Sequence, residues 1–253
     1  MSIIVLTNDD CIHAPGLKAL EDQLGELGEL WVIAPHAEQS ACGRSVTLNR
    51  PLRVERLGER RFAVDGTPSD CVLLGFRSLI AHPPAVVVSG INRGYNIGED
   101  LDYSGTVAAA AEGALQGAQL SLAVSMDRGE APAGLEWGAK VTALLVRQLL
   151  DHLLPPFCYL NVNLPRQQTP RVRWTRQGNP LPSGEVIKGI DPRGVPYYWI
   201  AERPDEANPP PQTDRGALRD GCISLSVLTL DRCHQGSWTR PNLCSSGFRE
   251  DQP

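Results

Sequence analysis

The chain has 253 residues, which is long enough to bury one sizeable core or to form one domain with an extension. Its apolar content of 42% and charged content of 21% are ordinary for a soluble globular protein. A net charge of −5 argues against a general binder of nucleic acids or anionic membranes, but it leaves room for a local basic pocket that takes a small phosphorylated substrate.

The amino terminus, the apolar stretches and the cysteines together predict a cytoplasmic protein. The first ten residues contain two acids and no basic region, unlike a signal peptide. The most apolar helical stretch, 106–118, contains Glu112 and Gln116, so no transmembrane helix is expected. The seven cysteines are scattered without a Cys-x-x-Cys pair, which is typical of reduced thiols.

The first part of the chain alternates short apolar runs with helical patterns. Strands are expected at 2–6 and 30–34, with a helix between them that begins at Pro15 and ends near Leu24, so the chain opens as a β-α-β unit with parallel strands. The next elements are expected in this order: a polar loop at 36–45, an edge hairpin formed by 46–57 and 61–65, a helix capped by Thr67 that ends near Ile80, a buried strand at 85–89, and a glycine-rich irregular stretch at 90–98.

The second part changes character at Pro165, after which proline and arginine become frequent. Before Pro165 we expect an alanine-rich helix from Ser104-Gly105-Thr106, a strand at 120–125, a helix at 135–154 and a strand at 159–162. Beyond Pro165 we expect short strands at 172–175 and 196–200, a half-exposed strand at 223–230 and a tail from about 237. This order predicts an α/β protein with a doubly wound, mostly parallel sheet. We expect a core at 1–180 and an extension at 181–253, with strand 222–230 returning to the core or to an interface.

An acidic pair, Asp9-Asp10, directly follows the first buried strand. Adjacent carboxylates repel each other, so a closely held pair needs a cation or a raised pKa. A hard divalent cation with oxygen ligands is the simplest solution. The alternative is an Asx-rich turn that caps the next helix.

Polar side chains in three loops are expected to meet at one edge of the sheet, because the carboxyl ends of parallel strands open on the same side. These residues are Asn8, Asp9, Asp10, Ser40 and Asn92. Carboxylate, hydroxyl and amide oxygens suit Mg²⁺, Mn²⁺ or Ca²⁺ and fit a structural zinc site poorly.

The helix start Ser104-Gly105-Thr106 is a candidate anion site, since free N–H groups and the helix dipole attract negative charge there. Taken alone, the tripeptide fits an ordinary N-cap better. Next to an acidic metal site, it favours metal-assisted phosphoryl transfer to water. The sequence lacks a P-loop, a Gly-x-Gly-x-x-Gly after a strand and a Gly-x-Ser-x-Gly elbow, and its five histidines show no metal-ligand spacing.

Five stretches of the chain resemble the SurE family of survival proteins, in the right order. They are 6–10 (Leu-Thr-Asn-Asp-Asp), 34–40 (Ala-Pro with Gln-Ser), 65–72 (Asp-Gly-Thr-Pro-Ser-Asp-Cys-Val), 88–94 (Val-Ser-Gly-Ile-Asn-Arg-Gly) and 103–107 (Tyr-Ser-Gly-Thr-Val), with weaker similarity at 160–163 and 191–194. The resemblance implies a Rossmann-like core whose later segments form dimer and tetramer contacts. It also implies a metal-dependent 5′/3′-nucleotidase that removes phosphate from nucleoside monophosphates.

The resemblance also implies roles for individual residues. One divalent metal ion per subunit, Mg²⁺ or Mn²⁺ with Ca²⁺ possible in a crystal, would be held by Asp9, Asp10, Ser40 and Asn92. Asn96, Ser104, Gly105 and Thr106 would contact phosphate, with Asn8 beside them. The expected partners are nucleoside monophosphates and further copies of the chain, as a homodimer or homotetramer, with no membrane and no stable nucleic-acid binding.

Two residues depart from the family pattern. Cys11 follows the Asp pair where the family usually has Gly, and a position that requires a positive φ would be strained by cysteine. Gln212 precedes Thr213-Asp214 where Gly is common, which leaves the conformation of that turn open.

We therefore expect a phosphomonoesterase in which Asp9 orients or deprotonates the attacking water, while Asn96 and the helix start at Ser104 stabilise charge on phosphate. Short polyphosphate is a further candidate substrate. Two alternatives stay open: a phosphatase with an aspartyl-phosphate intermediate, although that chemistry wants Asp at i and i+2 and position 8 is Asn, and a non-catalytic, metal-dependent nucleotide sensor.

Overall fold

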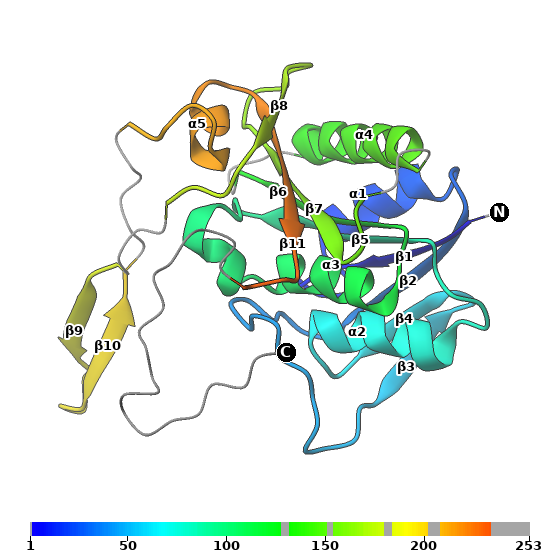
Figure 1. Ribbon diagram of the computed structural model, residues 1–253. Helices are drawn as coiled ribbons and strands as arrows, with labels where there is room; N and C mark the ends of the chain where they lie inside the picture. Colours follow the sequence, from blue (N-terminus) through cyan, green and yellow to red (C-terminus); the bar gives the residue numbers. More distant parts are fainter. Residues whose placement is uncertain (1, 128–131, 151–153, 180–183, 202–207, 234–253) are drawn as a thin grey trace, which may run out of the picture.

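The structure is a computed structural model that describes residues 2–127, 132–150, 154–179, 184–201 and 208–233. A nine-stranded sheet with the order β3-β4-β2-β1-β5-β6-β7-β11-β8 runs through its centre (Figure 1). Its strands are β1 (Ile3–Thr7), β2 (Glu29–Pro35), β3 (Val54–Gly58), β4 (Arg61–Val64), β5 (Val86–Arg93), β6 (Leu120–Met126), β7 (Cys158–Leu164), β8 (Val172–Thr175) and β11 (Ile223–Thr229). All neighbours from β4 to β7 are parallel, whereas β3 is antiparallel to β4 and β11 is antiparallel to β7.

Helices cover both faces of this sheet (Figure 1). Helices α1 (Pro15–Leu24) and α4 (Pro132–Leu149) lie against each other on one face, and α2 (Pro68–Leu74) and α3 (Gly105–Gln116) lie together on the other. From β1 the chain first builds outward through β2 and β4, and then crosses to β5, β6 and β7 on the opposite side of β1. The predicted doubly wound, mostly parallel sheet is thus confirmed, and its topological switch point lies between β1 and β5.

The apolar runs of the central strands are buried because helices cover both faces. Val86, Val87 and Val88 of β5 have no exposed surface, and every residue of α3 from 105 to 114 is buried. The alanines of α3 leave room for the helix to lie close to the sheet. The capping box predicted for α2 is present, since the Thr67 hydroxyl accepts the Asp70 N–H and the Asp70 carboxylate accepts the Thr67 N–H.

Several predicted boundaries are wrong. Residues 90–93, expected to be irregular, continue β5, because a register shift between Ser89 and Asn92 lets the strand keep pairing with β6. Gly90 sits in this bulge with a φ of 141°, and a Cβ there would lie 2.4 Å from the Val124 carbonyl oxygen. Strand β3 begins at Val54 rather than at residue 46. The helix expected to end near Ile80 does reach Leu79, but its last part, Gly75–Leu79, is a π-helical turn that follows α2.

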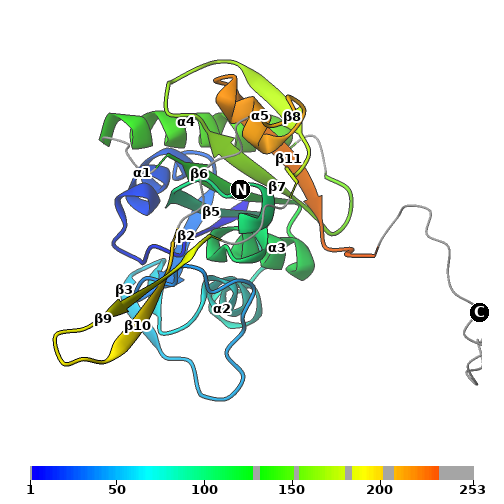
Figure 2. The same ribbon diagram turned by 90° about the vertical axis from the view of Figure 1, so that its left-hand side faces the viewer.

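Three elements were not predicted: strand β9 (Val186–Ile190), the short helix α5 (Asp214–Arg219) and the 3₁₀ turn Gly98–Asp102. Strand β9 pairs with β10 (Pro196–Ile200) in an antiparallel hairpin that projects from the body of the protein (Figures 1 and 2). The division at residue 180 into core and extension stays a prediction, and the tail expected from 237 lies outside the described residues. In the part of the chain that the structure describes, no helix has the length and apolarity needed to cross a membrane.

The turn after β1 is strained at Cys11, which has a φ of 104°. Among the described residues, the other non-glycine residues with positive φ are Ala41 and Phe157, so Gln212 fits its turn without a left-handed backbone. The Cys11 carbonyl accepts hydrogen bonds from the Asn8 side chain (2.8 Å) and the Ala14 N–H (3.1 Å), which hold the turn in place. The departure from glycine at this position therefore carries the conformational cost that the sequence implies.

Replacing Cys11 with glycine should raise the free energy of unfolding by about 1 kcal/mol, because glycine adopts this φ without steric strain. Chemical denaturation measures the change. Cys11→Ala is the matched control: it removes the sulfur but keeps the strain, so it should give little or no gain. Equal stabilisation by both variants would contradict the prediction.

Candidate functional site

The candidate site lies at the carboxyl edge of the sheet, at the switch point between β1 and β5. Thr7 pairs with Ser89, so the residues after β1 lie beside the end of β5. Asn8 and Asp9 are buried and Asp10 is half-buried. This is the position where open α/β sheets bind their ligands.

Asp9 is anchored to the start of α3. One of its carboxylate oxygens, Oδ2, accepts the Thr106 N–H at 3.0 Å, and the other, Oδ1, accepts the Thr106 hydroxyl. Its main-chain carbonyl accepts the Gln39 N–H at 2.8 Å, which brings the loop with Ser40 to the same place. Burial raises the pKa of Asp9 even though the two bonds from Thr106 lower it.

Asp10 faces the end of β5. Its carboxylate accepts a hydrogen bond from the Arg93 N–H, directly after Asn92. Burial, together with the neighbouring charge of Asp9, raises the pKa of Asp10 to about 6. Its Oδ2 atom is buried and has no hydrogen-bond partner among the described residues, as is also true of Asn8 Oδ1. These unpartnered oxygens and the raised pKa values show a site with excess negative potential.

Ser40 lies on an exposed loop that is tied to the site at several points. Its hydroxyl donates to Glu38 at 2.7 Å. Further along the loop, the Gly43 N–H donates to the Tyr103 carbonyl at 2.8 Å, and Arg44 forms an ion pair of 3.2 Å with Glu112 of α3.

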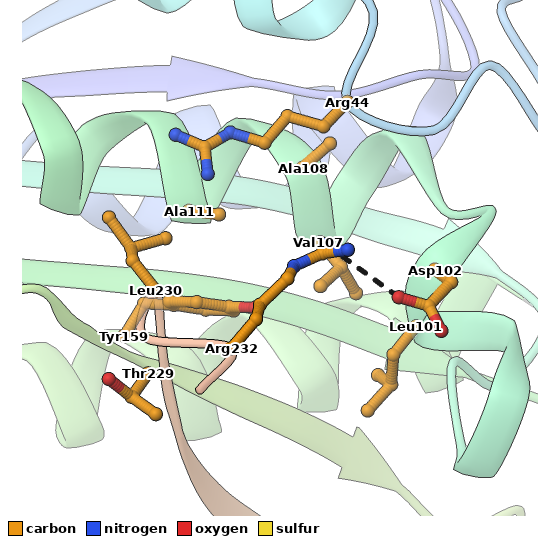
Figure 3. A pocket seen from close by; sticks show the side chains of 10 residues that line it. All are labelled: Arg44, Leu101, Asp102, Val107, Ala108, Ala111, Tyr159, Thr229, Leu230 and Arg232. Atoms are coloured by element: carbon orange, nitrogen blue, oxygen red, sulfur yellow. Dashed lines mark ion pairs between the residues drawn. The ribbon is translucent and has the colours of Figure 1, made fainter. Parts of the chain in front are cut away.

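A small hollow lies beside Arg44. In Figure 3 the Arg44 side chain extends over α3, above this hollow, in which a dashed line marks the ion pair between Arg232 and Asp102. That hollow, of about 30 Å³, is too small for a nucleoside.

The start of α3 is largely occupied by protein groups. The Ser104 hydroxyl accepts the Val107 N–H at 3.1 Å, as an N-cap, and the Thr106 N–H is bound to Asp9. The Gly105 N–H has no acceptor among the described residues. A Cβ at Gly105 would lie 2.8 Å from Cys42 Sγ and 3.0 Å from Asp9 Cβ, so only glycine fits here. The phosphate contacts expected from Ser104 and Thr106 stay predictions.

The backbone of Asn96 is held by a network of asparagine side chains that was not predicted from the sequence. Its N–H donates to Asn163 Oδ1, and its carbonyl accepts from the side chains of Asn161 and Asn163, all at 2.9 Å. Its own amide nitrogen donates to the Ser125 hydroxyl at 2.7 Å. The available signal was the alternation Leu160-Asn161-Val162-Asn163, which places two amides on one face of a buried strand.

The residues present fit a hard divalent cation. Asp9, Asp10 and Asn92 lie on neighbouring strand ends, with Ser40 in the adjoining loop, and Asp10 Oδ2 is an unpartnered carboxylate oxygen. Among the described residues, no group of three His, Cys, Asp or Glu side chains could hold a metal, so the serine hydroxyl and the asparagine amide would be needed to complete an oxygen site.

Comparison with known proteins decides the family. The family model described as "Survival protein SurE" matches residues 4–182. The chain belongs to the SurE family. A SurE relative from Pelobacter propionicus, named 5′-nucleotidase SurE, is 44% identical over 237 residues, covering 92% of this chain and 96% of the relative. A relative of the same name from Syntrophotalea carbinolica is 43% identical over 231 residues, covering 90% of this chain and 92% of the relative.

The fold comparison agrees with this assignment. The crystal structure of the SurE protein from Aquifex aeolicus matches with a TM-score of 0.82 and 38% identity, covering 91% of this chain and 94% of that one. The family expected from the sequence motifs is therefore confirmed, together with its Rossmann-like fold.

In the absence of metal, Asp10→Asn should stabilise this SurE protein at pH 7.5 by about 1 to 2 kcal/mol, allowing for solvent screening of a partly exposed group. The pKa of Asp10 is raised from 3.8 to about 6, so its stabilising contribution is complete below pH 3.8 and is lost as the pH rises through 6. The gain in the variant should therefore shrink towards pH 4. Denaturation in EDTA at both pH values measures it.

Asp65→Asn is the control, because the pKa of Asp65 is shifted in the opposite direction to that of Asp10. The Arg53 N–H and the Arg50 side chain lower the pKa of Asp65, so this substitution should not stabilise the protein at pH 7.5. If Asp10→Asn destabilised the metal-free protein at pH 7.5, the charge conflict at the site would be disproved.

Proposed function

We propose that this protein is a divalent-metal-dependent 5′-nucleotidase that hydrolyses nucleoside monophosphates to nucleoside and phosphate. The observation that supports it most is the buried acidic pair at the switch point, beside the N-terminus of α3, in a chain whose SurE relatives are named 5′-nucleotidases. Nucleoside 3′-monophosphates and short polyphosphate are further candidate substrates.

Asp9, Asp10, Ser40 and Asn92 would hold one divalent ion per subunit, and their hard oxygen donors suit Mg²⁺, Mn²⁺ or Ca²⁺, of which we propose Mg²⁺ or Mn²⁺. When bound, such an ion polarises phosphoryl oxygens and lowers the pKa of water. In the structure the Ser40 hydroxyl is bonded to Glu38. Because the hydroxyl donates in this bond, its oxygen lone pairs stay available to the ion.

Asp9 is the candidate for orienting or deprotonating the attacking water. The two hydrogen bonds from Thr106 fix the plane of its carboxylate, and burial raises its pKa, which strengthens it as a base. An aspartyl-phosphate mechanism wants Asp at i and i+2, and position 8 is Asn, which argues for direct attack by water over that alternative.

The substrate phosphate would lie against the start of α3. The Gly105 N–H is the donor there without a protein acceptor, and the helix dipole adds positive potential. Asn96 uses one of the two hydrogens of its amide nitrogen on Ser125, which leaves the second for an equatorial phosphate oxygen. These preorganised donors would stabilise charge that develops in the transition state.

We further propose that the protein is a cytoplasmic homodimer or homotetramer. The six cysteines among the described residues are free, in agreement with a reducing compartment. The projecting hairpin β9–β10 carries exposed apolar residues, including Ile190 at 69%, Trp199 at 68% and Ile200 at 77% exposure. A surface of this kind is typical of a subunit contact.

Phosphate release from a panel of 5′- and 3′-nucleoside monophosphates should require metal: none in EDTA, and activity restored by Mg²⁺ or Mn²⁺. Asp9→Asn should lower kcat/KM at saturating metal by at least about 100-fold, because it removes the proposed proton acceptor. The control Asp22→Asn changes an exposed carboxylate paired with Lys18 and should leave activity unchanged.

Near wild-type activity in Asp9→Asn would refute the role of Asp9. Nucleotide binding without any phosphate release, with every metal tested, would overturn the enzyme and favour the sensor.

A further inference from the structure

Asp214 is a fully buried carboxylate that holds three separate backbone N–H groups. It is the first residue of α5, which lies beside β8 and β11 (Figure 1). Its Oδ2 accepts the Gly98 N–H at 2.9 Å, and its Oδ1 accepts the N–H groups of Gly178 at 3.0 Å and Arg215 at 2.7 Å. Asp214 therefore ties the segment after β5 to the segment after β8.

Gly98 is held by residues of two later segments: Gln177, after β8, and Asp214 and Arg215, in α5. Its carbonyl accepts the Gln177 side chain at 2.6 Å, while its N–H is held by Asp214. The Arg215 guanidinium lies directly over its α-carbon, since a Cβ there would be 2.3 Å from Arg215 Nη1. Gly98 also has a φ of 54°, so both the contact with Arg215 and the backbone conformation require glycine here.

Arg215 is itself locked in place. It forms an ion pair of 2.8 Å with Glu99, in which the side chains are only 8% and 15% exposed, and it donates to the Asn179 carbonyl at 2.9 Å. Removing one partner of a charge pair with so little exposed surface strongly destabilises the folded protein, because the other charge is left buried and unpaired. The position of the guanidinium over Gly98 is therefore well determined.

Gly98 lies between the two elements that are proposed to contact phosphate. Asn96 is two residues before it, and the 3₁₀ turn Gly98–Asp102 leads from it to the N-cap Ser104, whose N–H donates to the Asp100 carbonyl at 3.0 Å. The asparagine network fixes Asn96 from β7, and Asp214 fixes the next turn from α5. The spacing between Asn96 and Ser104 thus depends on both supports.

We propose that Asp214 and Arg215 are positioning residues for phosphate binding: they hold the turn from Asn96 to Ser104 in the geometry that receives the substrate phosphate. The inference rests on the proposed nucleotidase function for its kinetic consequence. Its structural part, the clamp on Gly98, is independent of that function. Both residues lie beyond the segment 4–182 that matches the family model.

Asp214→Asn should test the clamp, because an asparagine side chain turns one of the two acceptor oxygens into a donor that faces a backbone N–H. In the folded variant at 25 °C, kcat/KM for a 5′-nucleoside monophosphate should fall by about 100-fold, as expected when phosphate contacts are displaced by about 1 Å. Inhibition by inorganic phosphate should weaken in parallel. Hydrogen exchange in a peptide spanning 94–102 should become faster.

Asp220→Asn is the matched control. Asp220 lies in the same segment and pairs with Arg173 at 2.8 Å, but among the described residues it forms no hydrogen bond or ion pair with the turn at Gly98, so phosphate inhibition and exchange at 94–102 should match the wild type. If Asp214→Asn fails to fold, Arg215→Met and the conservative Arg215→Lys replace it: Met should reproduce the loss, and Lys, which keeps the charge facing Glu99, should retain more of the activity.

The outcomes separate the two proposals. A wild type that releases no phosphate overturns the nucleotidase, while exchange at 94–102 still reports on the clamp. A wild type that turns over, with folded clamp variants whose phosphate inhibition and exchange are unchanged, overturns the positioning role. A loss of thermal stability with unchanged kinetics in the folded protein would show that Asp214 is structural only, and would also overturn it.

Discussion

The carboxylate of Asp9 is the point at which three distant parts of the chain meet. It follows β1, it binds the N–H and hydroxyl of Thr106 at the start of α3, and its main-chain carbonyl binds Gln39 in the loop with Ser40. In the structure, the negative charge at the N-terminus of α3 is thus supplied by the protein itself. Asp9 thus joins the end of β1, the start of α3 and the loop with Ser40 at one point of the proposed site.

This arrangement creates an electrostatic conflict that the fold alone does not resolve. Asp10 lies next to Asp9 and, with an unpartnered Oδ2, carries a pKa of about 6. A folded state that keeps two such carboxylates together sacrifices stability at neutral pH, as active sites commonly do. A bound cation would relieve both carboxylates at once, which would link the stability of the protein to the proposed metal ion.

The later part of the chain supports the site rather than supplying its reacting groups. Strand β7 provides Asn161 and Asn163, which hold the backbone of Asn96, and α5 provides Asp214, which holds Gly98. Strand β11 joins the sheet beside β7, and α5, which immediately precedes it, is thereby fixed against the sheet. Chain topology therefore makes residues beyond 200 part of the support for the proposed phosphate-binding geometry.

The sequence by itself determined the order of strands and helices in the central sheet, apart from α5, together with the doubly wound architecture, the family and the acidic pair, because these follow from local periodicity, capping and short motifs such as Thr67-Pro68-Ser69-Asp70. Tertiary structure alone decided that β5 continues through Gly90, that Thr106 binds Asp9, and that Asn163 and Asp214 hold the turn from Asn96 to Ser104. The physical reason is that a strand or an N-cap is specified by neighbouring residues, whereas a buried hydrogen bond across more than sixty residues depends on how the layers pack. Asp214 shows this most clearly, since nothing in its own segment indicates that its partner is Gly98.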